Sequence, residues 1–163
     1  MPFDNAYLGK RLQDLLTLAH SQMKEVYEAH GLVIPVEGSS TLHAIAPGTS
    51  ASLTEIAATL GQSHQLIAQR IGKLLALELA EKRADPNDGR RSEYILTPAG
   101  EEQWHRLDTL MQTIAKVNQR LFAEIGCDLV EGLDRALTAL AKEDYQSRSG
   151  TVSTPTYKEE VQP

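Results

Sequence analysis

The sequence has little cysteine, no long hydrophobic run and no surplus of positive charge. Its 163 residues include one cysteine, Cys127. A lone cysteine excludes an intrachain disulfide and fits a reducing compartment, so we expect a cytoplasmic protein. No apolar run approaches the roughly 20 residues of a membrane-spanning helix, and the N-terminal segment MPFDNAYLGKRL lacks the apolar core of a signal peptide. We therefore expect no association with a membrane.

The negative net charge argues only weakly against a nucleic-acid-binding protein. Lys and Arg number 16 against 22 Asp and Glu, which gives a formal net charge of −6. Phosphates are contacted by one face of a protein, so the distribution of charge matters more than its sum. Residues 64–91 contain six Lys or Arg and four Asp or Glu, so this window carries +2 and the remainder −8. The asymmetry is modest and favours a basic surface around residues 64–91.

Patterns typical of catalysis or metal binding are missing as well. There is no Gly-rich phosphate loop, nucleophile elbow or paired-carboxylate pattern, so we expect no enzyme and no cofactor. Cys127 precedes Asp128, whose charge disfavours a thiolate, so a structural role is expected for this cysteine. The histidines are scattered, with neither an i, i+4 pair nor a cysteine partner, so no metal site is expected. They are His20, His30, His43, His64 and His105.

Hydrophobic periodicity predicts a mainly helical protein. Apolar residues three and four apart predict long helices over residues 7–30, 98–125 and 129–144, and TLHAIA predicts a short one. Thr97 is a suitable N-cap for the helix that begins at Pro98. The long helices carry more apolar surface than a thin module could cover, which indicates a helical dimer interface.

Between the long helices lies a different pattern. Ser52 and Glu55 predict a capping box, Gly61 ends that helix, and Ser63 caps the next one after a GQS turn. These two helices form a helix-turn-helix pattern. LAEKRA and RSEYIL then predict two strands that flank the turn DPNDG, which is a β-hairpin. A helix-turn-helix followed by a hairpin is a winged helix, whose second helix enters the major groove while the hairpin tip contacts phosphate or the minor groove.

This arrangement defines the candidate DNA contacts. Glutamine can pair with adenine, lysine with guanine or phosphate, and arginine suits the negative minor groove. Some assignments stay open: Ser52 and Thr54 would be present as helix-terminal residues in any case, the helix face could simply be solvated, and strand alternation could turn Arg91 away from DNA. Asp88 could orient Arg90. The candidates are Ser52, Thr54, Ser63, His64, Gln65, Ala68, Gln69, Arg70, Lys73, Asp88, Arg90 and Arg91.

The segment SLTEIAATLGQSHQLIAQRIGKL, together with LAEKRADPNDGRRSEYILTPAG, resembles the MarR family of transcriptional regulators. Besides the helix-turn-helix, the resemblance is carried by Asp88 two residues before Arg90 and by Leu96, Thr97 and Gly100 at the start of the long helix. It covers residues 52–104 closely, and the flanking helices match in order and length.

The sequence departs from the family pattern at three positions. Arg70 stands where an apolar residue is usual, so it either extends to a phosphate or signals a shifted register. Glu78 replaces the glycine that commonly ends the recognition helix, and Gly89 stands where a second wing Arg or Lys is common. None of these departures breaks the module.

The resemblance implies a homodimer on double-stranded DNA with a pseudo-palindromic operator, and a cleft for a small amphipathic or phenolic effector that loosens DNA binding. The expected fold is mainly α with a small β-hairpin wing, a winged helix-turn-helix plus a helical dimerisation region. We expect dimerisation helices in 1–33 and 98–146, the DNA-binding region in 34–97, and a disordered tail in 147–163. The alternative is a winged-helix module that docks a protein and not DNA, which the acidic net charge and Gly89 favour. Salt dependence of binding would separate the two.

Overall fold

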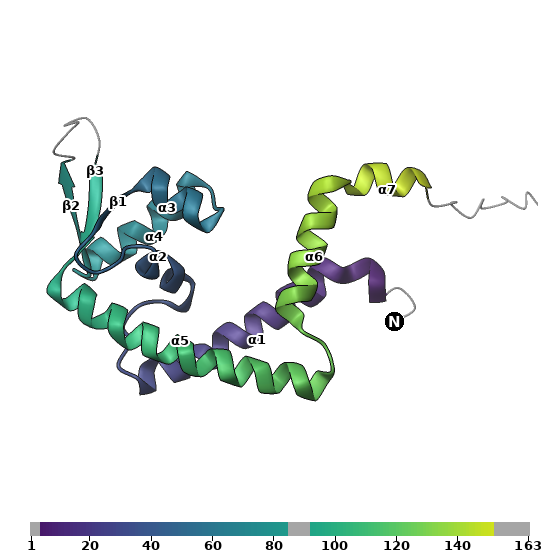
Figure 1. Ribbon diagram of the computed structural model, residues 1–163, viewed down its shortest axis with the longest axis horizontal. Coiled ribbons are helices and arrows are strands. Elements are labelled where there is room, and N and C mark those ends of the chain that lie inside the picture. Colours follow the sequence, from purple (N-terminus) through teal and green to yellow (C-terminus); the bar gives the residue numbers. More distant parts are fainter. Residues whose placement is uncertain (1–3, 85–91, 152–163) are drawn as a thin grey trace, which may run out of the picture. The chain divides into compact units, whose positions relative to one another are not determined.

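A computed structural model describes residues 4–84 and 92–151 (Figure 1). The chain forms two compact units, Met1–Ile114 and Ala115–Pro163, which divide within the longest helix. The elements up to that helix are η1 (Asp4–Tyr7), α1 (Leu8–Ala29), η2 (Val36–Gly38), α2 (Ser39–His43), β1 (Ser50–Ser52), α3 (Leu53–Leu60), α4 (His64–Ala76), β2 (Ala80–Ala84), β3 (Ser92–Leu96) and α5 (Pro98–Ile125). Two further helices follow, α6 (Leu129–Lys142) and α7 (Tyr145–Thr151).

The helix-turn-helix is built by the caps that the sequence predicts. Ser52 Oγ accepts a hydrogen bond from the Glu55 backbone N–H at 3.3 Å, and the Glu55 carboxylate accepts from the Ser52 N–H at 2.8 Å, which is a complete capping box. Gly61 ends α3 in the left-handed region with φ 59°. Ser63 caps α4 through the Leu66 N–H at 3.3 Å. Helix α3 therefore begins and ends, and helix α4 begins, at the residues that the sequence predicts.

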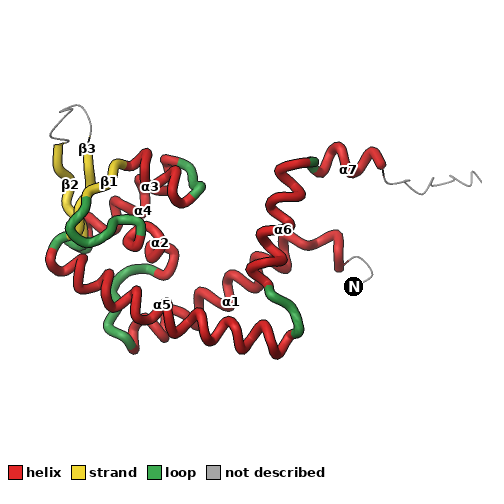
Figure 2. Tube along the Cα trace, viewed as in Figure 1, coloured by secondary structure: helices red, strands yellow, loops and turns green. Residues whose placement is uncertain are grey.

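The wing strands belong to a three-stranded antiparallel sheet in the order β1-β3-β2. The hairpin strands β2 and β3 are confirmed, with Ala80 opposite Leu96. Strand β1 was not predicted, because three residues are too few to show an alternating pattern. Its Ser50 lies opposite Ile95 on β3. In Figure 2, where strands are yellow, β1 directly precedes α3, β2 follows α4, and β3 leads into α5.

The core of the first unit is made by the short helices and the start of α5. Helix α4 packs against α2, α3 and β2 (Figure 1). Helical periodicity explains which side chains of these helices are buried, because residues three and four apart lie on the same face of a helix. The fully buried large side chains are Leu42, Ile45, Ile56, Ile67, Ile71, Leu74 and Leu107.

The junction between α4, the sheet and α5 explains the Leu-Thr-Pro-Ala-Gly stretch. Thr97 Oγ1 accepts from the Gly100 N–H at 3.0 Å and donates to the Glu78 carbonyl at 2.7 Å. Glu78 has φ 57°, so it adopts the left-handed conformation that favours glycine, which is the residue usual in the family here. A Cβ on Gly100 would lie 1.8 Å from the Leu79 carbonyl oxygen. Glycine is therefore required at position 100 by close backbone contact.

The second unit consists of the end of α5 with α6 and α7. Gly126, with φ 68°, ends α5, and Asp128 caps α6 by accepting from the Glu131 N–H at 3.0 Å. Helix α7 extends into the segment 147–163 that was expected to be disordered, so residues 147–151 differ from that expectation. Asp144 explains it locally, because its carboxylate accepts from the Ser147 N–H at 2.8 Å and nucleates the turn.

Candidate nucleic-acid interface

Helix α4 presents one polar face to solvent. Its apolar face is buried in the core through Ile67, Ile71 and Leu74, and this burial fixes the rotation of the helix about its axis. The opposite side chains are all exposed: His64, Gln65, Ala68, Gln69 and Lys73. The five predicted outward positions therefore lie on the solvent side, and their contact with DNA stays a prediction.

Two cationic side chains of α4 are held by residues from other elements. Lys73 Nζ donates to Glu37 Oε1 at 3.1 Å, which ties the recognition helix to η2. Arg70 Nη1 donates to Gln62 Oε1 at 2.6 Å in the turn between α3 and α4. Arg70 is half-buried there, so its charge is placed against the turn rather than in the apolar core. In the structure Arg70 is therefore held by the turn of the helix-turn-helix, and its contact with a phosphate stays a prediction.

The hydroxyl residues at the helix N-termini differ in how accessible they are. Ser52 is buried, and its hydroxyl donates to Glu55 Oε2 at 2.7 Å, so its hydrogen is already used within the capping box. Thr54 and Ser63 are exposed. Of these three candidates, the geometry leaves Thr54 and Ser63 better placed to donate to a phosphate.

The wing is described along its strands and not at its tip. Strand β2 carries Lys82 and Arg83, both exposed, and Arg83 Nε donates to Glu81 Oε1 at 2.9 Å. The predicted contacts Asp88, Arg90 and Arg91 lie outside the described residues. Lys82 is a cation on the wing that the sequence reasoning did not select. Its position on an exposed strand beside the predicted tip is the signal that could have identified it.

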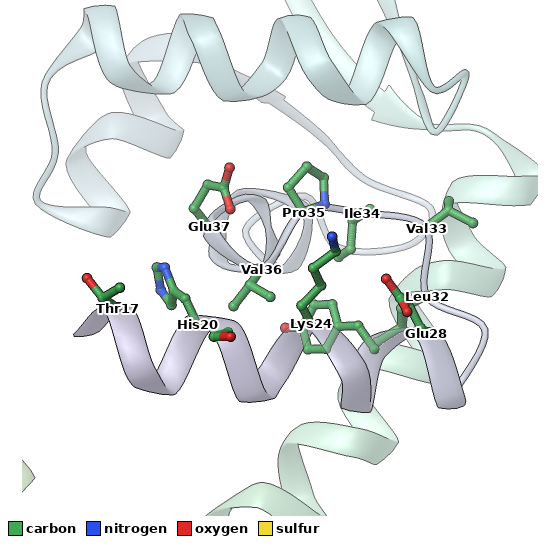
Figure 3. A pocket seen from close by; sticks show the side chains of 12 residues that line it. Thr17, His20, Lys24, Glu28, Leu32, Val33, Ile34, Pro35, Val36 and Glu37 are labelled. Carbon is green, nitrogen blue, oxygen red and sulfur yellow. The ribbon is translucent and has the colours of Figure 1, made fainter. Parts of the chain in front are cut away.

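A pocket of about 670 Å³ lies between α1 and the segment that leads into α2 (Figure 3). Tyr27, Leu32 and Ile34 are buried apolar side chains in its lining. Charged groups come from both walls: His20, Lys24 and Glu28 from α1, and Glu37 from η2. No residue of this pocket was identified from the sequence, because the pocket joins segments whose packing only the fold decides.

Two residues that line the pocket, Tyr27 and Glu37, have pKa values that are shifted from their ordinary values. Burial raises the pKa of Tyr27, against the opposing effect of the hydrogen bond between its hydroxyl and Ser39 Oγ, a contact of 2.6 Å. The pKa of Glu37 is lowered, first by a hydrogen bond with its own backbone and then by the hydrogen bond from Lys73, with a further contribution from the charge of His20. Glu37 is therefore a carboxylate at neutral pH.

Neither a metal site nor a membrane-spanning helix is found among the described residues. Among the residues that the structure describes, no three His, Cys, Asp or Glu side chains gather in a way that could hold a metal ion. Cys127 is exposed in the break between α5 and α6 and contributes nothing to the core. None of the described helices combines the length and the apolar character needed to cross a bilayer.

The chain is similar to known proteins both in sequence and in fold. The sequence model of the MarR family matches residues 39–91. No curated protein matches the chain. Among solved structures, a MarR-family transcription regulator is 22% identical with a TM-score of 0.61, covering 88% of this chain and 98% of its own.

Two further solved structures are similar in fold. The PcaV transcriptional regulator from Streptomyces coelicolor, in complex with its natural ligand, is 23% identical with a TM-score of 0.62, covering 87% of this chain and 94% of its own. The S. aureus MepR–DNA complex is 18% identical with a TM-score of 0.62, covering 86% of this chain and 97% of MepR. Because these solved structures are all less than 25% identical in sequence to this chain, their similarity establishes only its fold.

The family match and the fold agree on one assignment. MarR-family proteins are transcription regulators rather than enzymes, in line with the expectation from the sequence. The mainly helical architecture with a small antiparallel sheet is the expected winged helix. The predicted resemblance is thus confirmed: the chain has the winged-helix fold of the MarR family of transcription regulators, and residues 39–91 carry that family's sequence pattern.

Proposed function

We propose that this protein is a dimeric, sequence-specific, DNA-binding transcriptional regulator of the cytoplasm, acting as a repressor that a small effector releases. The observation that carries the proposal is the polar face of α4, whose side chains are exposed while the opposite face is buried in the core. The fold likeness to MepR, solved with DNA, and to PcaV, solved with its natural ligand, supports it.

In this proposal α4 enters the major groove. The groove is about 12 Å wide and admits one helix. Gln65 and Gln69 are four residues apart, so they share a face and can each pair with an adenine edge. Thr54 and Ser63 donate to phosphates from the starts of α3 and α4, and Arg90 inserts into the adjacent minor groove.

The exposed apolar side chains support a dimer. The first turns of α1 expose Leu8, Leu12, Leu15 and Leu16 by 40–48%, and Leu18 by 57%. In the second unit α6 exposes Val130, Leu133 and Leu137. Burial of apolar surface contributes about 25 cal/mol of favourable free energy per Å². A second copy of the chain would bury these side chains in an interface with two-fold symmetry. Two winged helices related in this way match a pseudo-palindromic operator.

The pocket beside α1 supports an effector site. A volume of about 670 Å³ lies within the range of small-molecule pockets. Its buried apolar residues and charged side chains suit a small amphipathic or phenolic molecule, with the apolar part against Leu32 and Ile34. Binding there releases the operator when the occupied conformation has the lower affinity for DNA.

The experiment is a fluorescence-anisotropy titration of operator-containing upstream DNA at two salt concentrations, with excess nonspecific competitor. We expect binding that survives the competitor and weakens linearly with log salt. Arg90→Ala should weaken binding by about tenfold, whereas Lys142→Ala, at the end of α6, should leave it unchanged. Unchanged affinity of Arg90→Ala would reject the wing contact. Absence of any specific, salt-sensitive binding to genomic fragments would instead favour the protein-docking alternative.

A further inference from the structure

Two basic side chains lie on one flank of α4. Arg70 and Lys73 are three residues apart, so they project from the same side of the helix, beside the exposed face that carries Gln65 and Gln69. An α-helix with its side chains is about 10–12 Å across, and the major groove is about 12 Å wide. A residue on the flank of a helix in the groove therefore meets the phosphate backbone at the groove wall.

The partners of these two cations differ in charge. Lys73 Nζ donates to Glu37 Oε1 at 3.1 Å, and the two side chains are 44% and 45% exposed. Arg70 Nη1 donates to Gln62 Oε1 at 2.6 Å, and within residues 4–84 and 92–151 Arg70 forms no ion pair. A carboxylate opposes the charge of its lysine, whereas a neutral amide leaves the charge of its arginine intact.

The number of donors adds to this difference. A guanidinium carries five N–H donors in a planar fork. One of the donors of Arg70 is used by Gln62, so the same group can contact a phosphate and keep its amide partner. Lys73 either loses its bond to Glu37 or keeps a carboxylate close to the phosphates. A phosphate contact is therefore less costly for Arg70 than for Lys73.

Gln62 holds the guanidinium of Arg70 at the turn of the helix-turn-helix. The Gln62 N–H donates to the Ala57 carbonyl at 3.0 Å, and Gly61, with φ 59°, ends α3 directly before it. The amide that accepts from Arg70 thus extends from a fixed backbone. Arg70 reaches back by about two turns of α4 to meet it, toward the end of the helix whose residues contact base edges in helix-turn-helix proteins.

We infer that Arg70 is the cation through which α4 contacts a phosphate, that Gln62 is its positioning residue, and that Lys73 instead ties α4 to η2. The inference rests on the proposed function, because it assumes that α4 enters the major groove. It gives Arg70 a role that the family pattern does not supply, since an apolar residue is usual at this position. Gln62 contributes by restraining Arg70, so that less rotamer freedom is lost when DNA binds.

The salt dependence of operator binding by the full chain separates the two cations. One phosphate contact contributes about one unit to the slope of log affinity against log salt, which is roughly fivefold in affinity at about 0.15 M salt. Arg70→Met should lower the magnitude of the slope by about one, and the affinity by about fivefold, for each protomer. Methionine suits a position where an apolar residue is usual, and circular dichroism checks that the variant folds.

Removal of the ion pair is the matched control. Lys73→Met combined with Glu37→Gln deletes both charges at unchanged net charge, and it should leave the slope as it is in the wild type. Lys142→Met, at the end of α6, removes the same charge as Arg70→Met and should also leave the slope unchanged. A slope that falls by about one in the ion-pair variant would overturn the division of roles between Arg70 and Lys73.

A double-mutant cycle tests the positioning role of Gln62. Gln62→Ala should weaken operator binding by about threefold without changing the slope, and it should have no effect in an Arg70→Met background. Arg70→Lys should keep the slope, because the charge remains, and should lose part of the affinity, because lysine lacks the planar fork. An equal effect of Gln62→Ala with and without Arg70 would overturn the positioning role.

The same titrations distinguish failure of this inference from failure of the proposed function. If the wild-type protein binds no DNA, the proposed function fails and the inference fails with it. If the wild type binds its operator and Arg70→Met has the same slope as Lys142→Met, only the inference fails.

Discussion

Gly100→Ala offers a sharp test of how the helical and winged parts are joined. A glycine-to-alanine change inside a helix ordinarily stabilises a protein by about 0.5–1 kcal/mol, because alanine has less backbone entropy to lose. At position 100 the added Cβ would lie 1.8 Å from the Leu79 carbonyl oxygen and 2.8 Å from its carbonyl carbon. Both are backbone atoms, so no side-chain rotation can relieve the clash.

The size of the effect follows from the displacement that is required. Ordinary contact needs about 3.5 Å, so α5 and the start of β2 must separate by more than about 1 Å. Overpacking of this kind costs about 1–3 kcal/mol. The same carbonyl accepts from the Thr97 N–H at 3.1 Å, and loss of that bond adds about 1 kcal/mol. We expect Gly100→Ala to lower the free energy of unfolding by about 3 kcal/mol and the Tm by roughly 10 °C.

Thermal melting followed by circular dichroism at one protomer concentration measures this change, since dimerisation would make Tm depend on concentration. Gly72→Ala is the matched control: it lies in helix α4 of the same unit, and a Cβ there meets nothing within 4 Å. It should raise stability by about 0.5–1 kcal/mol. If Gly100→Ala melted at or above the wild-type temperature, the close packing of α5 on Leu79 would be wrong.

Three further predictions follow from other local features. Glu78→Gly should raise the free energy of unfolding by about 1 kcal/mol in urea denaturation, because Glu78 holds φ 57°; no gain would argue against the strained turn. Ser52→Ala should lower stability by about 1 kcal/mol yet leave the salt slope of DNA binding unchanged, because the hydroxyl is used by Glu55. Burial raises the pKa of Tyr27. The buried phenol therefore contributes its full stabilisation of the fold below its unfolded-state pKa of 10.0, and this stabilisation is lost as pH rises through the folded-state pKa. Denaturation at increasing pH should therefore show a steeper loss for wild type than for Tyr27→Phe, and equal slopes would contradict burial of the phenol.

The helix boundaries and the helix-turn-helix could be predicted because their causes are local. A cap involves residues three apart, as with Ser52 and Glu55, and periodicity requires only neighbouring turns. The exposed face of α4 could be predicted in the same way, because the apolar residues that repeat every three or four positions define the buried face and leave the opposite face to solvent. Strand β1 escaped prediction because its three residues are defined by pairing with β3, more than 40 residues away in the chain.

The amino-acid sequence by itself determined the elements, the winged-helix order and the set of residues that can face DNA. Only the tertiary structure decided which of those residues are already engaged: Lys73 by Glu37, and Arg70 by Gln62. It also formed the pocket, by placing the segment after α1 against that helix. The physical reason is that capping and periodicity act within a few residues, whereas ion pairs and cavities depend on distances between segments that only the packed core sets.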